Sequence, residues 1–565
     1  MPVLSFTPSE SRPMQTSSRK VLFALTPLAF CLLQAGSACA QAIPGLNLAA
    51  PGGVALPQQL EGGETQGGLL TPLGTASAPL PARGNFVQPS VGMSVVQTSN
   101  VYFGSNNPAR SDTIFSITPG IAFQTLGPDL RTYGNFALNA QYYARSSYSN
   151  TVLPSGTLGL NARLVDQWLY FDAGINSQQN ALLTIPAQST GTATYTTTQY
   201  SLSPYIDHRF NDDLRLRARS ENVWTRISGN QTGAALSNGR YGKQSIRLDR
   251  RPTPLGWGLD AKQEETVYTN SGSLAVRDEI ARARVLYAFT PHFEGGLIGG
   301  YEHYSTGYAS LGHSIYGVQL NWRPNVFTRL DGVVERRFFG TGWDISASQQ
   351  IQRLSLRLNW NRAPSSYLAS LQTIPSGVSL STLLGGMLAS QYPDPAARAQ
   401  AVQNLLAVTG LPANLPNAVN YYTQSATLQD TLTLTGVLLA QRNSYTVSVF
   451  HTKTQDLILP GSPPLNNLLL ASADYVQNGI GLSYGRRLTP VMSLNVGLLR
   501  ALSTGFGPNE GVSTRQTTFI VQLSRRLSPQ TILVLGARRQ LLDTANSGIL
   551  SANESAVYAG VTHQF

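Results

Sequence analysis

Apolar and polar residues alternate along most of this chain. The stretch RLSLRLNWNR at 353–362 places leucines on one side of an extended backbone and arginines on the other. A period of two is typical of a β-strand with one apolar face. Further segments of this kind occur at 157–164, 214–219, 246–249, 281–289, 315–322 and 492–498. The alternation begins near residue 87 and continues to the C-terminus, which predicts an all-β protein.

Two classes of loop separate the predicted strands. One class is short and often carries proline, as at 127–129 and 290–292. The other class is long and polar, as at 228–240, 503–515 and 541–555. Short turns at one rim and long loops at the other are typical of an outer-membrane β-barrel. The loops therefore favour a transmembrane antiparallel up-and-down β-barrel over residues 87–565, with about 18–22 strands.

Alternative all-β folds fit the pattern less well. A propeller or a solenoid should show an internal repeat of fixed period, and none is visible. The arginine-bearing faces would be unfavourable in a dry core by several kcal/mol for each unpaired charge, whereas a water-filled lumen accommodates them. Trp322 and Trp360 fall near the ends of their segments, where an aromatic girdle is expected at the membrane interface.

Residues 363–424 interrupt the strand pattern with a helical insertion. Counting strands from the N-terminus places this insertion on the short-turn rim, whereas counting back from Phe565 places it on the long-loop rim. One helix is predicted from a leucine-rich stripe and a second from an N-cap, a stripe and a stop. The positions are Leu380, Leu383, Leu384, Met387 and Leu388 for the first, and Asp394, Pro395, Ala399, Val402, Leu405, Leu406, Gly410 and Pro412 for the second. We consider a lumen plug, a gating cap and a helical hairpin packed at one rim.

The composition supplies the candidate site. Charged residues make up only 12% of the chain, the net charge is +11, and nearly all of the positive charge is arginine. No dense run of lysine and arginine with interleaved aromatic residues is present, so we expect no nucleic-acid partner. The predicted lumen-lining basic residues are Arg215, Arg217, Arg219, Arg282, Arg284, Arg353 and Arg357. Rings of arginine favour anions in pores, but these side chains could equally pair with lumen acids such as Asp249.

The N-terminus has the layout of a secretory signal peptide over residues 1–40. A basic start precedes an apolar run, and Ala38 and Ala40 are the small residues that flank the expected cleavage site. A lipidated Cys39 is an alternative interpretation of the same segment. Cleavage after Ala40 would leave no cysteine for a disulfide or a thiolate metal site. Residues 41–86 are rich in proline and glycine and are predicted to form a flexible linker.

The chain ends in YAGVTHQF, which is similar to the C-terminal barrel-assembly signal of bacterial outer-membrane proteins. Tyr558, Gly560, His563 and Phe565 carry that resemblance, and His563 stands where a hydrophobic residue is more common. The alternative is a strand of a soluble protein that ends in phenylalanine.

No catalytic constellation stands out in the sequence. The histidines are scattered without metal-ligand spacing, and we expect no metal site, cofactor or catalytic residue. GHSIY at 312–316 begins like a nucleophile elbow but has Tyr316 in place of the second glycine. An outer-membrane hydrolase therefore remains the less favoured hypothesis.

Four short segments resemble a family of outer-membrane β-barrels associated with PEP-CTERM/exosortase systems, which is similar to the porin-2 barrels found beside exopolysaccharide genes. The segments are SNVYF at 99–103, SDTIFSITPGIAF at 111–123, ERRFFG at 335–340 and YPDPAARAQAV at 392–402. The family commonly has an aspartate where this chain has Ser99, so a role for that acidic position does not carry over. The resemblance covers about residues 87–565 and implies export of surface polysaccharide or surface proteins, without an established activity.

The expected function is that of an outer-membrane channel or conduit for anionic solutes or surface polysaccharide. The alternative is a structural or docking barrel without an open pore. We expect the protein to lie in the outer membrane of a Gram-negative bacterium. The expected partners are outer-membrane lipid, the barrel-assembly machinery, and polysaccharide or secretion components.

Overall fold

The structure is a computed structural model in which most of the predicted barrel is described. The described residues are 85–103, 108–147, 149–181, 194–228, 237–269, 275–351, 353–373, 384–385, 388, 401–402, 423–460, 474–546 and 551–565. The predicted signal peptide with Ala38 and Ala40, and nearly all of the predicted linker, lie outside these residues.

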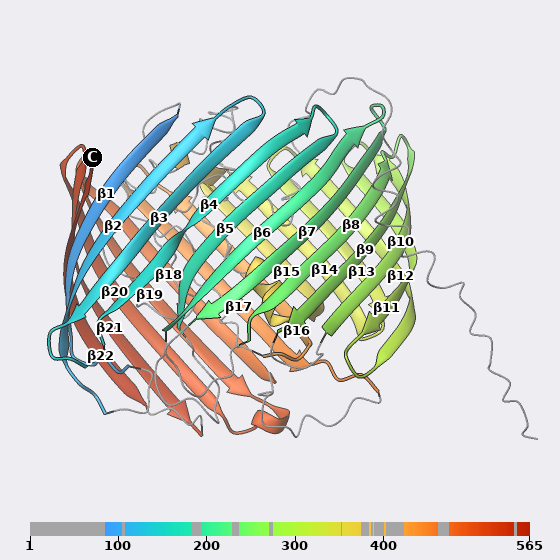
Figure 1. The fold of residues 1–565 in the computed structure, drawn as a ribbon. Coiled ribbons are helices and arrows are strands. Elements are labelled where there is room, and N and C mark those ends of the chain that lie inside the picture. Colours follow the sequence, from blue (N-terminus) through green and yellow to red (C-terminus); the bar gives the residue numbers. More distant parts are fainter. Residues whose placement is uncertain are drawn as a thin grey trace, which may run out of the picture. The chain divides into compact units, whose positions relative to one another are not determined.

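Twenty-two antiparallel strands form one closed sheet (Figure 1). Each strand pairs with its neighbours in sequence, and β22 pairs with β1 to close the ring. The strands are β1 Phe86–Thr98, β2 Asp112–Leu126, β3 Leu130–Tyr143, β4 Thr151–Val165, β5 Leu169–Ala181, β6 Thr194–Arg209, β7 Leu214–Ser228, β8 Gly239–Arg250, β9 Leu255–Tyr268, β10 Ala275–Thr290, β11 Phe293–Ser305, β12 Ser310–Asn325, β13 Thr328–Arg337, β14 Gly340–Ile351, β15 Leu354–Ser365, β16 Thr427–Leu439, β17 Asn443–Asp456, β18 Tyr475–Thr489, β19 Met492–Gly505, β20 Ser513–Ser528, β21 Thr531–Ala545 and β22 Ala552–Gln564. The predicted antiparallel up-and-down β-barrel is confirmed.

The seam between β22 and β1 is held by side chains as well as by the backbone. The Ser99 amide donates to the Ser555 carbonyl at 2.9 Å, and the Ser555 amide donates to the Ser99 hydroxyl at 2.8 Å. Thr98 donates to the buried Glu554 carboxylate at 2.7 Å. The segment SNVYF, which carried part of the family resemblance, therefore begins at the barrel seam.

Connections at the two rims differ in length. Every link from an even-numbered strand to the next strand is short, and these links share one rim with the start of β1 and the end of β22. The links from odd-numbered strands, including the insertion between β15 and β16, lie at the other rim. Counting back from Phe565 therefore gave the correct side for the insertion, and counting from the N-terminus was wrong.

The helices within the insertion are described only in part. One of them, α2 (Tyr367–Thr373), was not predicted. Leu384, Leu388 and Val402 are in helical conformation as expected, and Leu384 and Val402 are buried. The other predicted positions lie outside the described residues: Leu380, Leu383, Met387, Asp394, Pro395, Ala399, Leu405, Leu406, Gly410 and Pro412. In the part of the chain that is described, no helix is long and apolar enough to cross a membrane.

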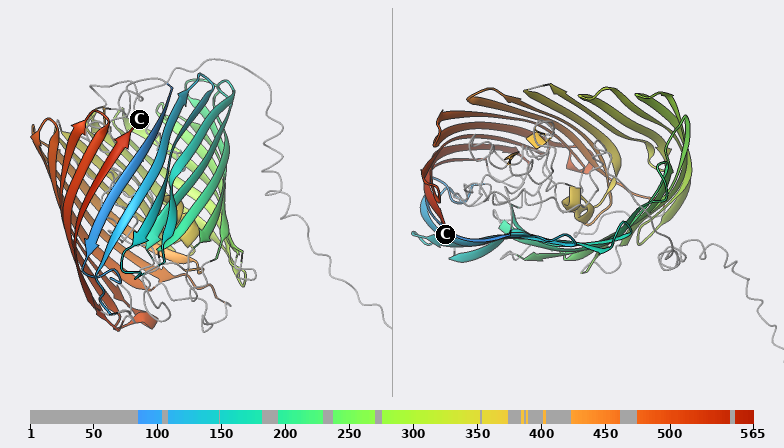
Figure 2. Two further views of the ribbon diagram at one scale, coloured as in Figure 1. Left: turned by 60° about the vertical axis from the view of Figure 1, so that its left-hand side comes forward. Right: turned by 90° about the horizontal axis from the view of Figure 1, so that it is seen from above.

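The two faces of the sheet have opposite character. Viewed from above, α2 lies inside the ring of strands, which identifies the face it contacts as the inner face (Figure 2). The opposite face presents large apolar side chains, and Val87, Leu297 and Val318 are more than half exposed. Apolar surface of this extent is rare on soluble monomers. A closed sheet satisfies every backbone group without an edge, as hydrocarbon requires.

Aromatic side chains on the inner face lie over glycines of the neighbouring strand. Tyr558 on β22 covers Gly536 on β21, where an added Cβ would lie 2.3 Å from the tyrosine ring. Tyr133 on β3 covers Gly159 on β4 in the same way, again at 2.3 Å. Each of these glycines is required because a side chain would displace the ring that covers it.

The predicted barrel-assembly signal forms the last part of the closing strand. Tyr558 and Gly560 face inward on β22. The His563 Nδ1 atom lies 2.9 Å from the Thr531 hydroxyl, and its ring meets Phe565 edge-on with 4.8 Å between centroids. Recognition of these residues by the barrel-assembly machinery stays a prediction.

Candidate functional site

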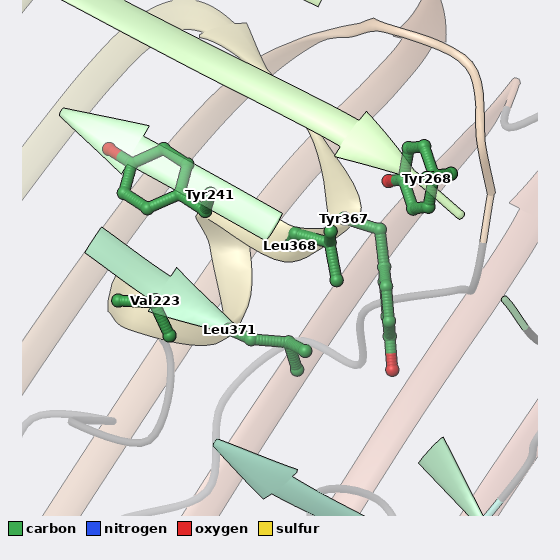
Figure 3. Close-up of a cluster of buried hydrophobic side chains, with 6 residues drawn as sticks. All are labelled: Val223, Tyr241, Tyr268, Tyr367, Leu368 and Leu371. Atoms are coloured by element: carbon green, nitrogen blue, oxygen red, sulfur yellow. The ribbon is translucent and has the colours of Figure 1, made fainter. Parts of the chain in front are cut away.

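The inner wall of the barrel is the candidate site, and α2 identifies which residues belong to it. The helix packs through apolar side chains on β7, β8 and β9 (Figure 3). The cluster contains Val223, Tyr241, Tyr268, Tyr367, Leu368 and Leu371. Residues two apart on a strand share a face. Every second residue counted from these wall positions therefore faces the lumen.

The predicted arginines of β7 are on this inner face, and each pairs with an aspartate. Arg215 pairs with Asp207 of β6. Arg217 lies 3.1 Å from Asp249 of β8. Arg219 lies 2.9 Å from Asp172 of β5, a pair that is largely buried. The three arginines are therefore charge-compensated by strands on both sides of β7.

The predicted arginines of β10 are more deeply enclosed. Arg282 contacts Glu335 at 2.7 Å and Asp260 at 3.6 Å. Arg284 contacts Asp260 at 3.0 Å and Asp249 at 3.2 Å. The Arg282–Glu335 pair joins β10 to β13 across the two strands between them. Such pairs brace the concave side of the sheet.

Asp249 is shared by several cations. Its carboxylate lies 3.1 Å from Arg217, 2.5 Å from Arg247 and 3.2 Å from Arg284. The hypothesis that lumen acids such as Asp249 balance the arginines therefore describes the geometry of β7, β8 and β10. An uncompensated anion-attracting ring is not formed by these residues.

The two remaining predicted arginines have different surroundings. Arg357 on β15 faces inward and donates through Nε to the Asn359 side chain at 3.3 Å. It has no ion-pair partner among the described residues. Arg353 lies in the turn before β15 rather than on the strand, and it is exposed. Arg357 is thus the predicted position with an uncompensated charge in the wall.

Two buried ion pairs were missed in the sequence. Arg337 on β13 pairs with Glu302 of β11 and lies 3.2 Å from Asp278 of β10. Arg538 on β21 lies 2.7 Å from Glu554 of β22. Alternation alone places these side chains on the polar face. Their partners come from other strands, so no local signal reveals the pairing.

Charge is concentrated on one arc of the wall. Apart from Arg538–Glu554, the ion pairs described above lie on strands β5 to β13. The inner positions of β16 to β20 are uncharged except for Asp456, Arg487 and Arg526 near the strand ends. Hydroxyl and amide side chains predominate on this second arc. Examples are Thr431, Thr433, Thr435, Ser448, Thr452, Gln477, Asn495, Gln516 and Thr518. The lumen therefore has a charged arc and a neutral polar arc.

Neither a metal-binding cluster nor the GHSIY pair is assembled in the part of the chain that the structure describes. Within the residues that the structure describes, no three His, Cys, Asp or Glu side chains lie close enough to hold a metal ion. In the GHSIY segment, His313 and Ser314 are consecutive on β12 and point to opposite faces of the sheet. They cannot act together as a nucleophile and its base, which require hydrogen-bond contact.

The fold defines a class, a large closed antiparallel β-barrel of outer-membrane type. No protein-family model matches the chain, and no curated protein matches its sequence. Solved structures with similarity include the siderophore receptor PiuA from Acinetobacter baumannii, at 8% identity over 86% of this chain and 82% of that chain, with a TM-score of 0.44. The ferric-catecholate import receptor Fiu from E. coli K12 matches at 9% identity over 86% and 82% of the respective chains, with a TM-score of 0.42. The FrpB iron transporter from Neisseria meningitidis matches at 11% identity over 86% and 83%, with a TM-score of 0.39. At these values the similarity assigns neither a family nor a ligand to this chain.

Proposed function

We propose that this chain is an outer-membrane conduit of a Gram-negative bacterium and that its cargo is a surface polysaccharide. The observation that carries the proposal is the closed sheet of 22 strands with a polar inner face and an apolar outer face. Barrels of this strand number enclose a lumen wide enough for a channel or a plug. A wall of hydroxyl, amide and paired ionic groups suits an aqueous path.

Polysaccharide is favoured over small anions because of charge compensation. Arg282 and Arg284 each contact two carboxylates. These carboxylates offset most of the positive electrostatic potential with which the two arginines would attract anions. The neutral arc on β16 to β20 offers hydrogen-bonding groups without charge, which suits a chain rich in hydroxyl groups. Association with an exopolysaccharide or exosortase system is supported by the sequence resemblance. Glu335 and Arg337 of the ERRFFG segment belong to the buried ion pairs of the wall.

Ion selectivity and sugar block test the cargo. The purified barrel is inserted in a planar lipid bilayer under a salt gradient, and the reversal potential is measured. Because the charges of the wall are compensated, we expect weak selectivity between anions and cations. An uncharged oligosaccharide added to one side should reduce the current. Strong anion selectivity with no effect of the sugar would instead support the anionic-solute hypothesis.

A second candidate function is a docking barrel without an open pore. The observation that favours it is α2, which is fixed to the inner wall by Leu368, fully buried beside Gly239. The two ends of the insertion are tied to the same wall, because the Ser366 and Thr266 hydroxyls lie 2.7 Å apart and Tyr268 donates to the Thr423 carbonyl. Membrane placement itself is tested by heat-modifiable migration of the outer-membrane fraction. Complete extraction of the protein by carbonate would contradict both candidates.

A further inference from the structure

Several arginines lie on the outer face of the barrel toward the long-loop rim. They point away from the lumen and therefore do not line it. These side chains alternate with the inner-facing residues and point outward. The outward cations in that half are Arg226, Arg240, Arg277, Arg336, Arg362, Lys453, Arg500, Arg515 and Arg539. The outward carboxylates at the same level are fewer, namely Glu265, Glu279, Asp430 and Asp543.

Three of these cations lie on the adjacent strands β19, β20 and β21 (Figure 1). Arg500, Arg515 and Arg539 are all exposed, and none has an ion-pair partner among the described residues. Arg539 donates only to the Ser555 hydroxyl. Asp543 is opposite Arg515 in register but forms no ion pair with it. The contrast with the adjacent Arg538, buried against Glu554 on the inner face, is complete.

Arg500 lies near the headgroup edge of the apolar band. Arg500 follows the short-turn end of β19, Met492, by eight residues. At about 3.3 Å per residue and a tilt of about 40°, that places its Cα roughly 20 Å above the short-turn rim, within an apolar band of about 25 Å. On β2, by contrast, the apolar outer face continues to Phe115, further from the short-turn rim. The level of Arg500 is about 5 Å from the upper edge of the band, where a lipid-facing arginine costs roughly 0–1 kcal/mol and its guanidinium can reach lipid headgroups.

An apolar groove on the same outer face reaches this arginine cluster. The groove has a volume of about 390 Å³ and crosses β15 to β19. It opens at Gly436, where an added Cβ would lie 3.0 Å from the Leu356 and Val447 side chains. Its β19 wall is Val496 and Leu498, and Arg500 is the next outward residue on that strand. A charged cluster at one end of an apolar groove matches a lipid with an anionic headgroup.

We infer that Arg500, Arg515 and Arg539 bind the phosphates of a phosphorylated glycolipid in the outer leaflet, with one acyl chain seated in the groove at Gly436. Guanidinium groups bind phosphate in a fork geometry that is stronger than a neutral hydrogen bond. The hydroxyls of Thr517 on β20 and Ser555 on β22 also point outward and can donate to headgroup oxygens. The inference uses the outer-membrane placement proposed above but does not require an open pore.

Native mass spectrometry of the folded full-length barrel in lipid nanodiscs tests this site. The probe is an acylated disaccharide with two phosphates, compared with the same glycolipid after removal of both phosphates. We expect the wild type to retain the diphosphorylated lipid at least tenfold more strongly. The triple variant Arg500→Gln/Arg515→Gln/Arg539→Gln should lose that preference, each arginine contributing about tenfold or less.

Matched variants separate the site from general electrostatics. Arg525→Gln removes an exposed outward arginine of β20 at the short-turn end, and it should leave binding unchanged. Gly436→Leu fills the groove and should weaken binding of the acylated lipid but not of the deacylated headgroup. The proposal is overturned if Arg525→Gln weakens binding as much as the triple variant, if both lipids bind equally, or if inorganic phosphate alone binds as strongly as the lipid. The lipid-binding measurement does not depend on conductance. Failure of the proposed lipid site is therefore distinguishable from failure of the proposed conduit.

Discussion

The buried pair between Arg337 and Glu302 gives the sharpest stability prediction. Both side chains are almost inaccessible to solvent, and Arg337 also lies 3.2 Å from the Asp278 carboxylate. Replacing Arg337 with methionine keeps most of the side-chain volume but leaves two enclosed carboxylates without their shared cation. Removing one partner of a buried ion pair costs about 3–5 kcal/mol. At about 4 kcal/mol the ratio of folded to unfolded protein falls roughly a thousandfold.

A control and a double variant separate charge burial from loss of packing. The Arg329–Asp331 pair lies on the same strand but is about one quarter exposed on each side, so Arg329→Met should cost no more than about 1 kcal/mol. The double variant Arg337→Met/Glu302→Met removes the stranded carboxylate and should be more stable than Arg337→Met alone. Asp278 retains Lys262 at 3.9 Å in both backgrounds.

The free energy of unfolding is measured by urea titration of the barrel in lipid vesicles, followed by tryptophan fluorescence. We expect Arg337→Met to lose several kcal/mol more than Arg329→Met. Equal losses in these two variants, or a double variant less stable than Arg337→Met, would refute the assignment of a buried and coupled pair.

Three further predictions concern packing on the inner face. Gly536→Ala should lower the yield of heat-modifiable folded barrel, because its Cβ would lie 2.3 Å from the ring of Tyr558, and a yield equal to wild type would contradict this. Leu368→Asp should release α2 from β7 to β9, because a carboxylate would replace a fully buried side chain; faster proteolysis near residue 373 measures the release. Glu554→Gln should destabilise the barrel by about 2–4 kcal/mol, since it removes the partner of the buried Arg538, and unchanged urea stability would exclude that role.

The strands could be predicted from the sequence because their signal is local. Alternation along RLSLRLNWNR places Leu354, Leu356 and Leu358 on the outer face of β15, and the structure has them there. The same stretch also shows the limit of local patterns. Its first residue, Arg353, continues the alternation but lies in the preceding turn.

The strand count from the N-terminus gave the wrong rim for the insertion, and the reason is physical. The predicted rim alternates with each strand that is counted, so one missed or overcounted segment places the insertion at the wrong rim. The links 306–309 and 338–339 are short, yet they lie on the long-loop rim. A hairpin of either length satisfies the backbone, so length alone does not determine the side. Both links precede the insertion, so only the count from the N-terminus crosses them, and missing one of the two links places every later link at the opposite rim.

The ion pairs of the wall required the three-dimensional fold. Arg282 and Glu335 are 53 residues apart in sequence and meet only because β10 to β13 curve around a common lumen. Alternation alone predicts that the arginines of β7 and β10 face inward. Their compensation by Asp172, Asp249 and other carboxylates, which changes the inferred cargo, could not be read from spacing.

Single-channel current shows whether the lumen provides an aqueous path. Purified wild-type barrel and the Leu368→Asp variant are each inserted in planar bilayers at the same protein-to-lipid ratio. We expect discrete current steps for the wild type and steps at least as large when α2 is released from the wall. Folded barrel that gives no steps in either form would contradict the conduit and leave the docking barrel.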